Sequence, residues 1–377
     1  MSSHVTSADD ELRGLLRSSV ERFGQDNGDR RKLRNARGVG SGVPTLLWGE
    51  MAARGWFGLL VPESHGGSGL GFGELAIVAQ GLGSALLAEP FVSTAVGGPL
   101  VLLRCGNDTL QRELLPAVAS GEERLALAWQ ENATLDISSL RTACVDQGSR
   151  LTLSGRKRFV AAGLDATRFV VAAVRDGALG LYLTDTAHPS IHKEAELRAD
   201  GTSSCTLMFR DTPAMELAGP ALARQLLEEA VDATVVMSCA ELVGLIDGAL
   251  QVMLQYLRDR RQFGRALGGF QALQHRAVDL YIQQQLSIAA LGAAVRELDG
   301  DSARAERGRA ASRAKSRCAN AALRVTRQAI QLHGAMGITD ECDIGLYLKR
   351  ALVASAWMGN AAAHRQRFAS FESASTE

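Results

Sequence analysis

The sequence lacks the closely spaced cysteines of metal-binding and disulfide-rich proteins and the long apolar runs of membrane proteins. Its six cysteines are widely spaced and form no C-x-x-C pair, so we expect no zinc or other metal site and no disulfide framework in so large a chain. It also has no run of about 18 uninterrupted apolar residues, so no membrane span is expected. The cysteines are therefore interpreted as small buried hydrophobes in a reducing cytoplasm.

An excess of charge of one sign is also missing. The 41 lysines and arginines balance 41 aspartates and glutamates, which gives a formal net charge of zero. No surplus of cations is available to displace counterions from phosphates, so we expect no nucleic-acid partner. The first residues are polar and no apolar stretch of a signal peptide follows them, which again favours a cytoplasmic protein.

What the chain does contain is an ordered change of periodicity. Its length of 377 residues suggests two or three domains, and 46% hydrophobic residues are enough for a sizeable core. Apolar residues recur at helical spacing up to about residue 124 and again from about residue 221. Between these parts lie short strand-like runs separated by glycine-containing turns: 151–155, 169–174, 180–183 and 206–209.

These patterns predict a mainly α protein with a β-domain. We expect an N-terminal helical domain over residues 1–124, a small β-barrel over 125–220 and a C-terminal helical domain over 221–377. The last part should hold four long helical runs, near 221–260, 270–298, 302–334 and 342–369. Four long helices with short links are typical of a four-helix bundle.

The connection between the first two of these helices carries the most information. Charged residues gather where the first helix ends, and Gly264 and the pair Gly268-Gly269 then break the chain. In this turn, Arg260 can make charge-assisted hydrogen bonds to a phosphate, and Gln262 can bond the edge of a ring. Taken alone, the segment also fits a simple helix–helix connector with a solvated basic cluster.

Two further segments combine glycines with polar residues in a similar way. Residues 331–341 read Q-L-H-G-A-M-G-I-T-D-E, and residues 60–69 read L-V-P-E-S-H-G-G-S-G. With residues 260–274, they resemble the signatures of the acyl-CoA dehydrogenase family: R-x-Q-F-G-x-x-I-x-x-F-Q-x-x-Q, Q-x-x-G-G-x-G-x-x-x-E and P-E-x-x-G-G-x-G. The order and spacing hold over almost the whole chain, and the sequence of helical, β and bundle parts is the layout of that family.

The resemblance implies FAD, held between the β-domain and the bundle, with a neighbouring subunit closing over the adenine end. Residues at three places would hold its pyrophosphate and adenosine. Arg260, Gln262 and Phe263 would reach an FAD bound mainly by the partner, and Phe270 and Gln274 would flank the same region. Gln331, Gly334 and Ala335 would approach the pyrophosphate from the other subunit. Glycines allow close backbone approach, while amides and a guanidinium suit phosphate. The alternative for Gly334 and Gly337 is a helix C-cap followed by a turn.

In the β-domain, the resemblance places the flavin ring against residues 128–131 and 159–163. The implied contacts are Trp129, Gln130, Phe159 and Ala161. The family often has serine or threonine where Gln130 and Ala161 stand, and Ala161 could offer only its backbone N–H. The family's P-G-A-G-S-D loop at the acyl-CoA entrance is replaced by N-A-T-L-D-I at residues 132–137. Each aromatic residue taken alone equally fits an ordinary core position.

The catalytic base is the main departure from the family. The reaction needs a carboxylate to remove a proton beside the thioester carbonyl while a hydride leaves the adjacent carbon. Met358 stands where most of the family has this glutamate, and Thr234 stands at the position used by a minority. Glu241 lies two turns after Thr234, on nearly the same helix face and among apolar neighbours, so burial would raise its pKa as a base requires.

Glu241 has an equally weighted alternative, a buried ion pair with an arginine of another helix such as Arg313 or Arg324. Glu341 and Asp343 fit a bundle-end ion pair or a helix N-cap better than a base. The basic residues of the last helices, including the adjacent pair Lys349 and Arg350, are expected to form a solvated face. His333 is expected to be packed and hydrogen-bonded.

Within the family, residues 338–364 look like the small-subunit branch, which includes pimeloyl-CoA dehydrogenase small subunits and heteromeric enzymes of steroid breakdown. The implied function is FAD-dependent α,β-dehydrogenation of an acyl-CoA thioester, in a homo-oligomer or a heterotetramer with a related subunit. Electron-transfer flavoprotein is the implied electron acceptor. Two alternatives remain: a catalytically incomplete partner that completes the FAD site of a related chain, and a flavin-dependent oxidase or hydroxylase on this fold.

Overall fold

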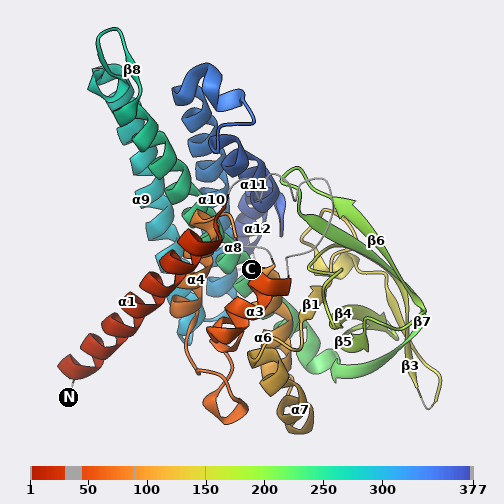
Figure 1. Cartoon of the computed structure of the whole chain (residues 1–377). Helices are drawn as coiled ribbons and strands as arrows, with labels where there is room; N and C mark the ends of the chain where they lie inside the picture. Colours follow the sequence, from red (N-terminus) through yellow and green to blue (C-terminus); the bar gives the residue numbers. More distant parts are fainter. Residues whose placement is uncertain (1, 30–44, 88–89, 149, 374–377) are drawn as a thin grey trace. The chain divides into compact units, whose positions relative to one another are not determined.

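A computed structural model describes residues 2–29, 45–87, 90–148 and 150–373, and its chain divides into two compact units. The first unit comprises the described parts of Met1–Asn35, Ala76–Ala88 and Val236–Glu377. The second comprises the described parts of Ala36–Leu75 and Glu89–Val235. Figure 1 labels most of the helices and strands. Each unit combines segments that are distant in sequence but packed together. The units therefore do not test the predicted division into residues 1–124, 125–220 and 221–377, which stays a prediction.

The second unit contains short helices and all of the strands of one sheet. Its helical elements are α3 (Thr45–Ala53), η1 (Trp56–Gly58), η2 (Glu63–His65), α5 (Phe91–Ala95), α6 (Gly97–Arg104) and α7 (Asp108–Ala119). Its strands are β1 (Leu125–Ala128), β2 (Ala143–Asp146), β3 (Leu151–Ala161), β4 (Arg168–Arg175), β5 (Ala178–Asp185), β6 (Ile191–Leu197) and β7 (Ser203–Ala218). The short turn η3 (Ile137–Ser139) lies between β1 and β2.

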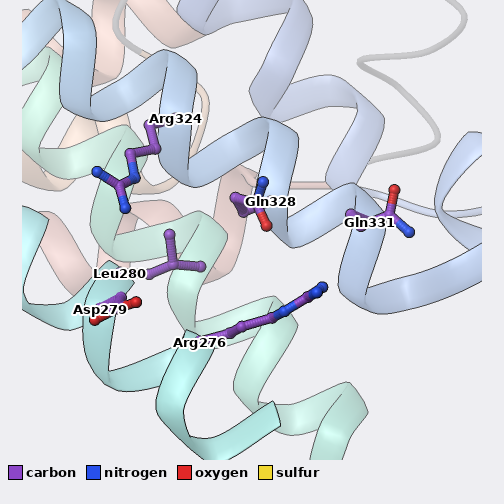
Figure 2. A pocket seen from close by; sticks show the side chains of 6 residues that line it. All are labelled: Arg276, Asp279, Leu280, Arg324, Gln328 and Gln331. Carbon is purple, nitrogen blue, oxygen red and sulfur yellow. The ribbon is translucent and has the colours of Figure 1, made fainter. Parts of the chain in front are cut away.

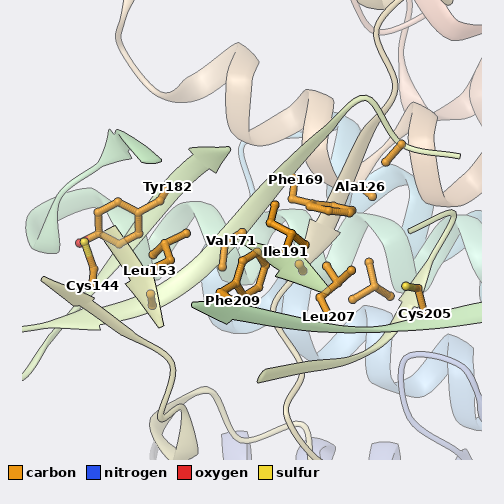
Figure 3. Close-up of a cluster of buried hydrophobic side chains, with 14 residues drawn as sticks. Ala126, Cys144, Leu153, Phe169, Val171, Tyr182, Ile191, Cys205, Leu207 and Phe209 are labelled. Atoms are coloured by element: carbon orange, nitrogen blue, oxygen red, sulfur yellow. The ribbon is translucent and has the colours of Figure 1, made fainter. Parts of the chain in front are cut away.

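The sheet closes on itself. Strands pair in the order β4, β2, β3, β7 and β5, and β5 pairs again with β4, while β1 and β6 extend the sheet along β4 and β7. Alternate residues of these strands point into one core, where Phe169 and Phe209 meet edge to face with centroids 6.5 Å apart (Figure 3). This confirms the predicted small β-barrel, although β1, β2 and β6 were not predicted.

The first unit is helical. It contains α1 (Ser2–Asn27), most of α4 (Phe72–Ser84), the later part of α8 (Pro220–Asp259), α9 (Gln271–Asp299), α10 (Arg304–His333), α11 (Ile344–Ala356) and α12 (Ala361–Ser373). Helix α10 packs against α9, α11 and α12 (Figure 1). Among the described helices, α8 is long and apolar enough to cross a membrane, but 94% of its apolar window is buried in the protein. Burial of this kind identifies a core helix.

The mainly α fold with a β-domain is therefore confirmed, and two details differ from the prediction. The connection after α8 contains a small hairpin, β8 (Arg261–Gln262) and β9 (Arg265–Ala266), followed by the turn η4 (Leu267–Gly269). The single helix predicted over 342–369 is wrong, because the chain breaks between α11 and α12. Another short turn, η5 (Gly334–Ile338), follows α10.

Candidate functional site

The end of β1 and a bulge in β3 bring the predicted flavin-ring segments together. Trp129 and Gln130 follow β1 directly and are buried. The pairing of β3 with β7 shifts register between Lys157 and Val160, which marks a bulge. At the bulge the Arg158 N–H donates to the carbonyl of Gln130 at 2.8 Å. The two segments, distant in sequence, are thus hydrogen-bonded neighbours within the second unit.

The bulge is held in an unfavourable backbone conformation. Phe159 and Ala162 both have a φ of +57°, the left-handed region that non-glycine residues rarely adopt. Such residues cost on the order of 1–3 kcal/mol each and cluster at binding and catalytic sites. The Arg158 guanidinium lies 4.6 Å from the centroid of the Phe159 ring. The two left-handed residues set the direction of the backbone N–H and C=O groups of residues 159–162. Ala161, which lies between them, is buried and has no side-chain donor.

The hairpin that follows α8 holds the predicted phosphate-binding residues in the first unit. Strands β8 and β9 pair antiparallel through a two-residue loop, Phe263 and Gly264, with φ values of +53° and +80°. Two consecutive positive φ angles are typical of a type I′ turn, whose twist matches that of a hairpin. Phe263 at its tip is 89% exposed. The side chains of Arg260 and Gln262 are exposed as well.

The base of this hairpin is fixed by Phe270 and Gln274. The Arg265 guanidinium lies 4.0 Å from the centroid of the Phe270 ring, and the Gln274 amide donates to the carbonyl of Gly268 at 2.8 Å. Phe263 meets Phe270 edge to face at 6.3 Å. Phe270 and Gln274 therefore hold the hairpin in place, whereas the exposed side chains of Arg260 and Gln262 have no hydrogen-bond partner among the described residues and can face another molecule.

The last turn of α10 holds the other predicted group. Gly334 caps α10 with φ +61° and ψ −142°, a conformation essentially confined to glycine, and a side chain there would point into open space. Ala335 beside it is exposed. His333 is buried, its Nδ1 lies 2.7 Å from the carbonyl of Ala329, and its ring stacks on Tyr256 at 4.4 Å. Gly334 is thus a helix cap that leaves room for a ligand, and His333 is packed as expected.

A pocket of about 400 Å³ opens beside this turn, between α9 and α10 (Figure 2). It is lined by Arg276, Asp279, Leu280, Arg324, Gln328 and Gln331. Two guanidiniums and two amides against one carboxylate suit a ligand that is anionic and rich in hydrogen-bond acceptors, as a dinucleotide is. The donor set and the open glycine turn therefore fit the phosphate-bearing part of FAD.

Most of these lining residues were not predicted as site residues, and Arg324 was expected either on a solvated face or as an ion-pair partner of Glu241. A signal was present in the sequence. Arg324 and Gln328 lie seven and three residues before the predicted Gln331 on α10, so their side chains share a helix face with it.

The position predicted to match the family's usual glutamate lies in the break between α11 and α12. Met358 there is buried and has a φ of +58°, and Gly359 has a φ of +96°. The Asn360 side chain accepts from the N–H groups of Ala362 and Ala363 and so caps α12. Two left-handed residues and a new cap explain why one helix could not continue through this segment.

His364 ties this break to α10. Its Nε2 lies 2.9 Å from the Met358 carbonyl, which can only accept, so Nε2 carries the proton. Its Nδ1 then accepts from the Ser312 hydroxyl at 3.3 Å. Burial lowers the pKa of His364 to about 3, and the Met358 carbonyl opposes that shift. The ring is therefore neutral at physiological pH and holds the Met358 carbonyl in place.

This histidine predicts a loss of stability in mild acid. Its pKa in the unfolded chain is near 6.5, so the unfolded state takes up a proton first as the pH falls. We expect the stabilisation by neutral His364 to be complete above about pH 6.5 and to fall below it by up to about 1.4 kcal/mol per pH unit. Urea unfolding at pH 7, 6 and 5 measures this slope. His364→Gln should flatten it, exposed His275→Gln should not, and equal slopes in both variants would contradict the assignment.

The two remaining candidates for a base lie on α8. The Thr234 hydroxyl donates to the carbonyl of Ala230 at 2.7 Å, within the same helix. Glu241 is 1% exposed, and its Oε1 accepts from Arg350 Nε at 2.5 Å. The ion-pair alternative for Glu241 thus has a partner in the structure, but it is Arg350 and not Arg313 or Arg324. Arg350 is buried, so the solvated face expected for it is wrong.

Comparisons with known proteins agree with this architecture. The model of the acyl-CoA dehydrogenase C-terminal domain matches residues 224–371, and that of the N-terminal domain matches residues 10–122. Acyl-CoA dehydrogenase IpdE2 of Mycolicibacterium smegmatis is 28% identical over 344 residues, which cover 90% of this chain and 92% of that protein. The probable acyl-CoA dehydrogenase FadE25 of Mycobacterium tuberculosis is 28% identical over 79% of this chain and 80% of its own length.

Solved structures show the same fold. A variant of the Tcur3481-Tcur3483 steroid ACAD has a TM-score of 0.89 at 29% identity, over 97% of this chain and 99% of that chain. Butyryl-CoA dehydrogenase from Megasphaera elsdenii has a TM-score of 0.86 at 19% identity, over 94% and 97% of the two chains. With family models matching more than half of its residues, the chain belongs to the acyl-CoA dehydrogenase family of FAD-dependent oxidoreductases.

Proposed function

We propose that this acyl-CoA dehydrogenase chain works as one subunit of an oligomer with a related chain and that its hairpin completes a flavin site on its neighbour. The observation that carries the proposal is the β8–β9 hairpin. A type I′ turn presents a phenylalanine that is 89% exposed, next to the exposed side chains of Arg260 and Gln262, whose donors have no partner within the described part of the chain. A large apolar side chain held out in this way is suited to a contact with another molecule.

One face of α9 supports an oligomer independently. Five large apolar side chains on this helix are between 41% and 55% exposed: Val278, Tyr281, Ile282, Leu286 and Ile288. Val278, Ile282 and Leu286 follow one another at i+4 spacing, so they form a continuous stripe. A contiguous exposed apolar stripe of this kind marks a protein interface. We propose that a second acyl-CoA dehydrogenase chain covers it.

The residues at the family's base positions favour a related, non-identical partner. Met358 and Thr234 cannot accept a proton, and the carboxylate of Glu241 is engaged by Arg350. A homo-oligomer repeats this deficiency in each copy, whereas a related chain can bring its own carboxylate. The similarity to the Tcur3481-Tcur3483 steroid ACAD supports a heteromer and an acyl-CoA thioester of a steroid-derived acid as the substrate class.

The residues of this chain would then have two roles in binding FAD. Arg260, Gln262 and the pocket arginines would hold the phosphates of an FAD bound by the neighbouring chain. The backbone of residues 159–162, which belongs to the second unit, would lie against a flavin ring system. When bound, FAD supplies the hydride acceptor for the dehydrogenation. Electron-transfer flavoprotein is the acceptor that we propose for the reduced enzyme. The cytoplasm is the compartment that we propose, supported by six cysteines in thiol form.

Purification alone and with a partner tests this proposal. We expect the chain alone to carry little flavin and to form incomplete oligomers, because the site that Phe263 and its neighbours serve is on another chain. Co-expression with a homologue encoded nearby should give a yellow complex of defined mass that an acyl-CoA bleaches. The visible spectrum and light scattering measure both. A chain that is stably monomeric, or fully yellow and bleached by acyl-CoA on its own, would contradict the proposal.

A further inference from the structure

A lysine inside the β-barrel has no part in the function described so far. Lys157 of β3 is completely buried. Its Nζ donates to Glu131 Oε1 at 2.6 Å and to the carbonyl of Trp129 at 3.3 Å. Fully buried lysines are rare unless they are paired, and this one is paired to the segment predicted to lie against the flavin ring. The pair spans 26 residues of sequence and joins the bulged strand to the end of β1.

The carboxylate of this pair is bound from several directions. Glu131 Oε1 also accepts from the Thr142 N–H at 2.9 Å and from the Thr142 hydroxyl at 2.7 Å, and Oε2 accepts from the Arg141 N–H at 2.7 Å. Burial raises the pKa of Glu131, but the Lys157 charge and the hydrogen bonds from Lys157 and Thr142 together bring it below its usual value. Glu131 is thus an ionised anchor that fixes where the Lys157 ammonium lies.

The ammonium in turn orients the flavin-facing backbone. Burial lowers the pKa of Lys157 to about 8, and the Glu131 carboxylate opposes the shift, so the ion pair is formed at neutral pH. Lys157 binds the Trp129 carbonyl, and the Arg158 N–H binds the next carbonyl, that of Gln130. Two consecutive carbonyls are therefore tied to two consecutive residues of β3, immediately before the strained Phe159.

Stability alone does not account for this arrangement. A buried ion pair is often no more stabilising than apolar residues of the same volume, because both charges lose their hydration. What the pair provides here is a fixed register between two segments that no strand pairing joins among the described residues, since β1 pairs with β4 whereas β3 pairs with β2 and β7. A small shift there displaces both segments together, and a bound ring system tolerates little displacement.

We propose that Lys157 is a positioning residue, which sets the geometry of residues 129–131 and 158–162 against the flavin ring through its pair with Glu131. The inference rests on the proposed function, because it assumes that these segments contact flavin. Lys157 itself does not need to touch the cofactor, and its effect passes through the Trp129 carbonyl.

The test compares Lys157→Met with a matched control, Arg175→Met, in the assembled holo-complex. Arg175 pairs with Glu216 at 2.7 Å in the same barrel but contacts neither segment. In Lys157→Met we expect on the order of tenfold weaker FAD binding by the refilled apo-protein, a changed shape of the visible flavin bands, and faster amide hydrogen exchange at residues 129–131 and 158–162. Arg175→Met should leave all three readouts unchanged.

A second variant separates positioning from stability. Lys157→Met/Glu131→Gln removes the unpaired buried charge, so its melting temperature should recover towards that of the wild type, while FAD affinity and the flavin bands stay altered. If the double variant recovered FAD affinity and the flavin bands as well as the melting temperature, the inference about Lys157 would be wrong. Equal behaviour of Lys157→Met and Arg175→Met would also contradict it, and neither result would affect the proposed function. A wild-type complex without flavin would overturn the proposed function as well, so the two failures are distinguishable.

Discussion

Replacing Arg350 with methionine should destabilise the protein by about 3–5 kcal/mol, the usual cost of leaving one partner of a buried ion pair without the other. The side chains of Arg350 and Glu241 are 9% and 1% exposed, and Arg350 Nε donates to Glu241 Oε1 at 2.5 Å. Methionine fills much of the same volume but leaves the carboxylate of Glu241 without this donor. The free energy of unfolding, measured in urea, should fall by that amount.

The control for this variant is Arg313→Met. Arg313 is an exposed arginine of α10, and surface substitutions usually change stability by no more than about 0.5 kcal/mol. The double variant Glu241→Gln/Arg350→Met should recover much of the loss, since it removes both charges. Equal stability of Arg350→Met and Arg313→Met would show that the ion pair does not form in solution.

Glu241→Gln distinguishes the ion pair from the catalytic base. If Glu241 serves only Arg350, the variant should be less stable, yet its folded fraction should keep the wild-type rate of flavin reduction by acyl-CoA. If Glu241 removes the substrate proton, that rate should fall by roughly 10²-fold or more while the flavin stays bound. Stopped-flow measurement of flavin bleaching gives this rate. The contact with Arg350 favours the first result.

The periodicity of apolar residues was sufficient to predict the long helices. It was not sufficient to predict where a helix ends and the chain changes direction. Helices α8, α9 and α10 were predicted because apolar residues recur over many turns. The break between α11 and α12 was missed, because alanines on both sides favour a helix and only Gly359 interrupts them. The helix ends because the backbone of Met358 is in the left-handed region. Methionine rarely adopts this conformation, so the sequence does not indicate it.

The buried charges were missed for a related reason. Lys349 and Arg350 are adjacent, and a run of basic residues is usually solvated. Neighbouring residues on a helix nevertheless point about 100° apart, so one can face the core. Lys157 stands between Arg156 and Arg158, and the alternation of a strand places it inside the barrel while its neighbours face away. Its partner Glu131 belongs to another segment, a pairing that only the fold creates.

Met358→Glu should raise the rate of flavin reduction by acyl-CoA by roughly 10²-fold, the scale of a general base. Met358 stands where the family's glutamate is predicted to lie. Met358 is buried with a left-handed backbone, and His364 holds its carbonyl at 2.9 Å. Glutamate is similar in length to methionine, and a carboxylate buried at this point has a raised pKa, as proton abstraction requires.

Met358→Gln is the matched control, because glutamine has the same length and shape as glutamate but no carboxylate to accept the proton. Both variants should keep the flavin content and oligomeric state of the wild type, and single-turnover bleaching should separate them. A gain in Met358→Glu alone would show that this chain retains a productive substrate site and lacks only the base. If neither variant gains activity while flavin stays bound, the acyl-CoA does not reach this position, and the chain acts through its neighbour's site. The second outcome would strengthen the partner role that the exposed hairpin supports.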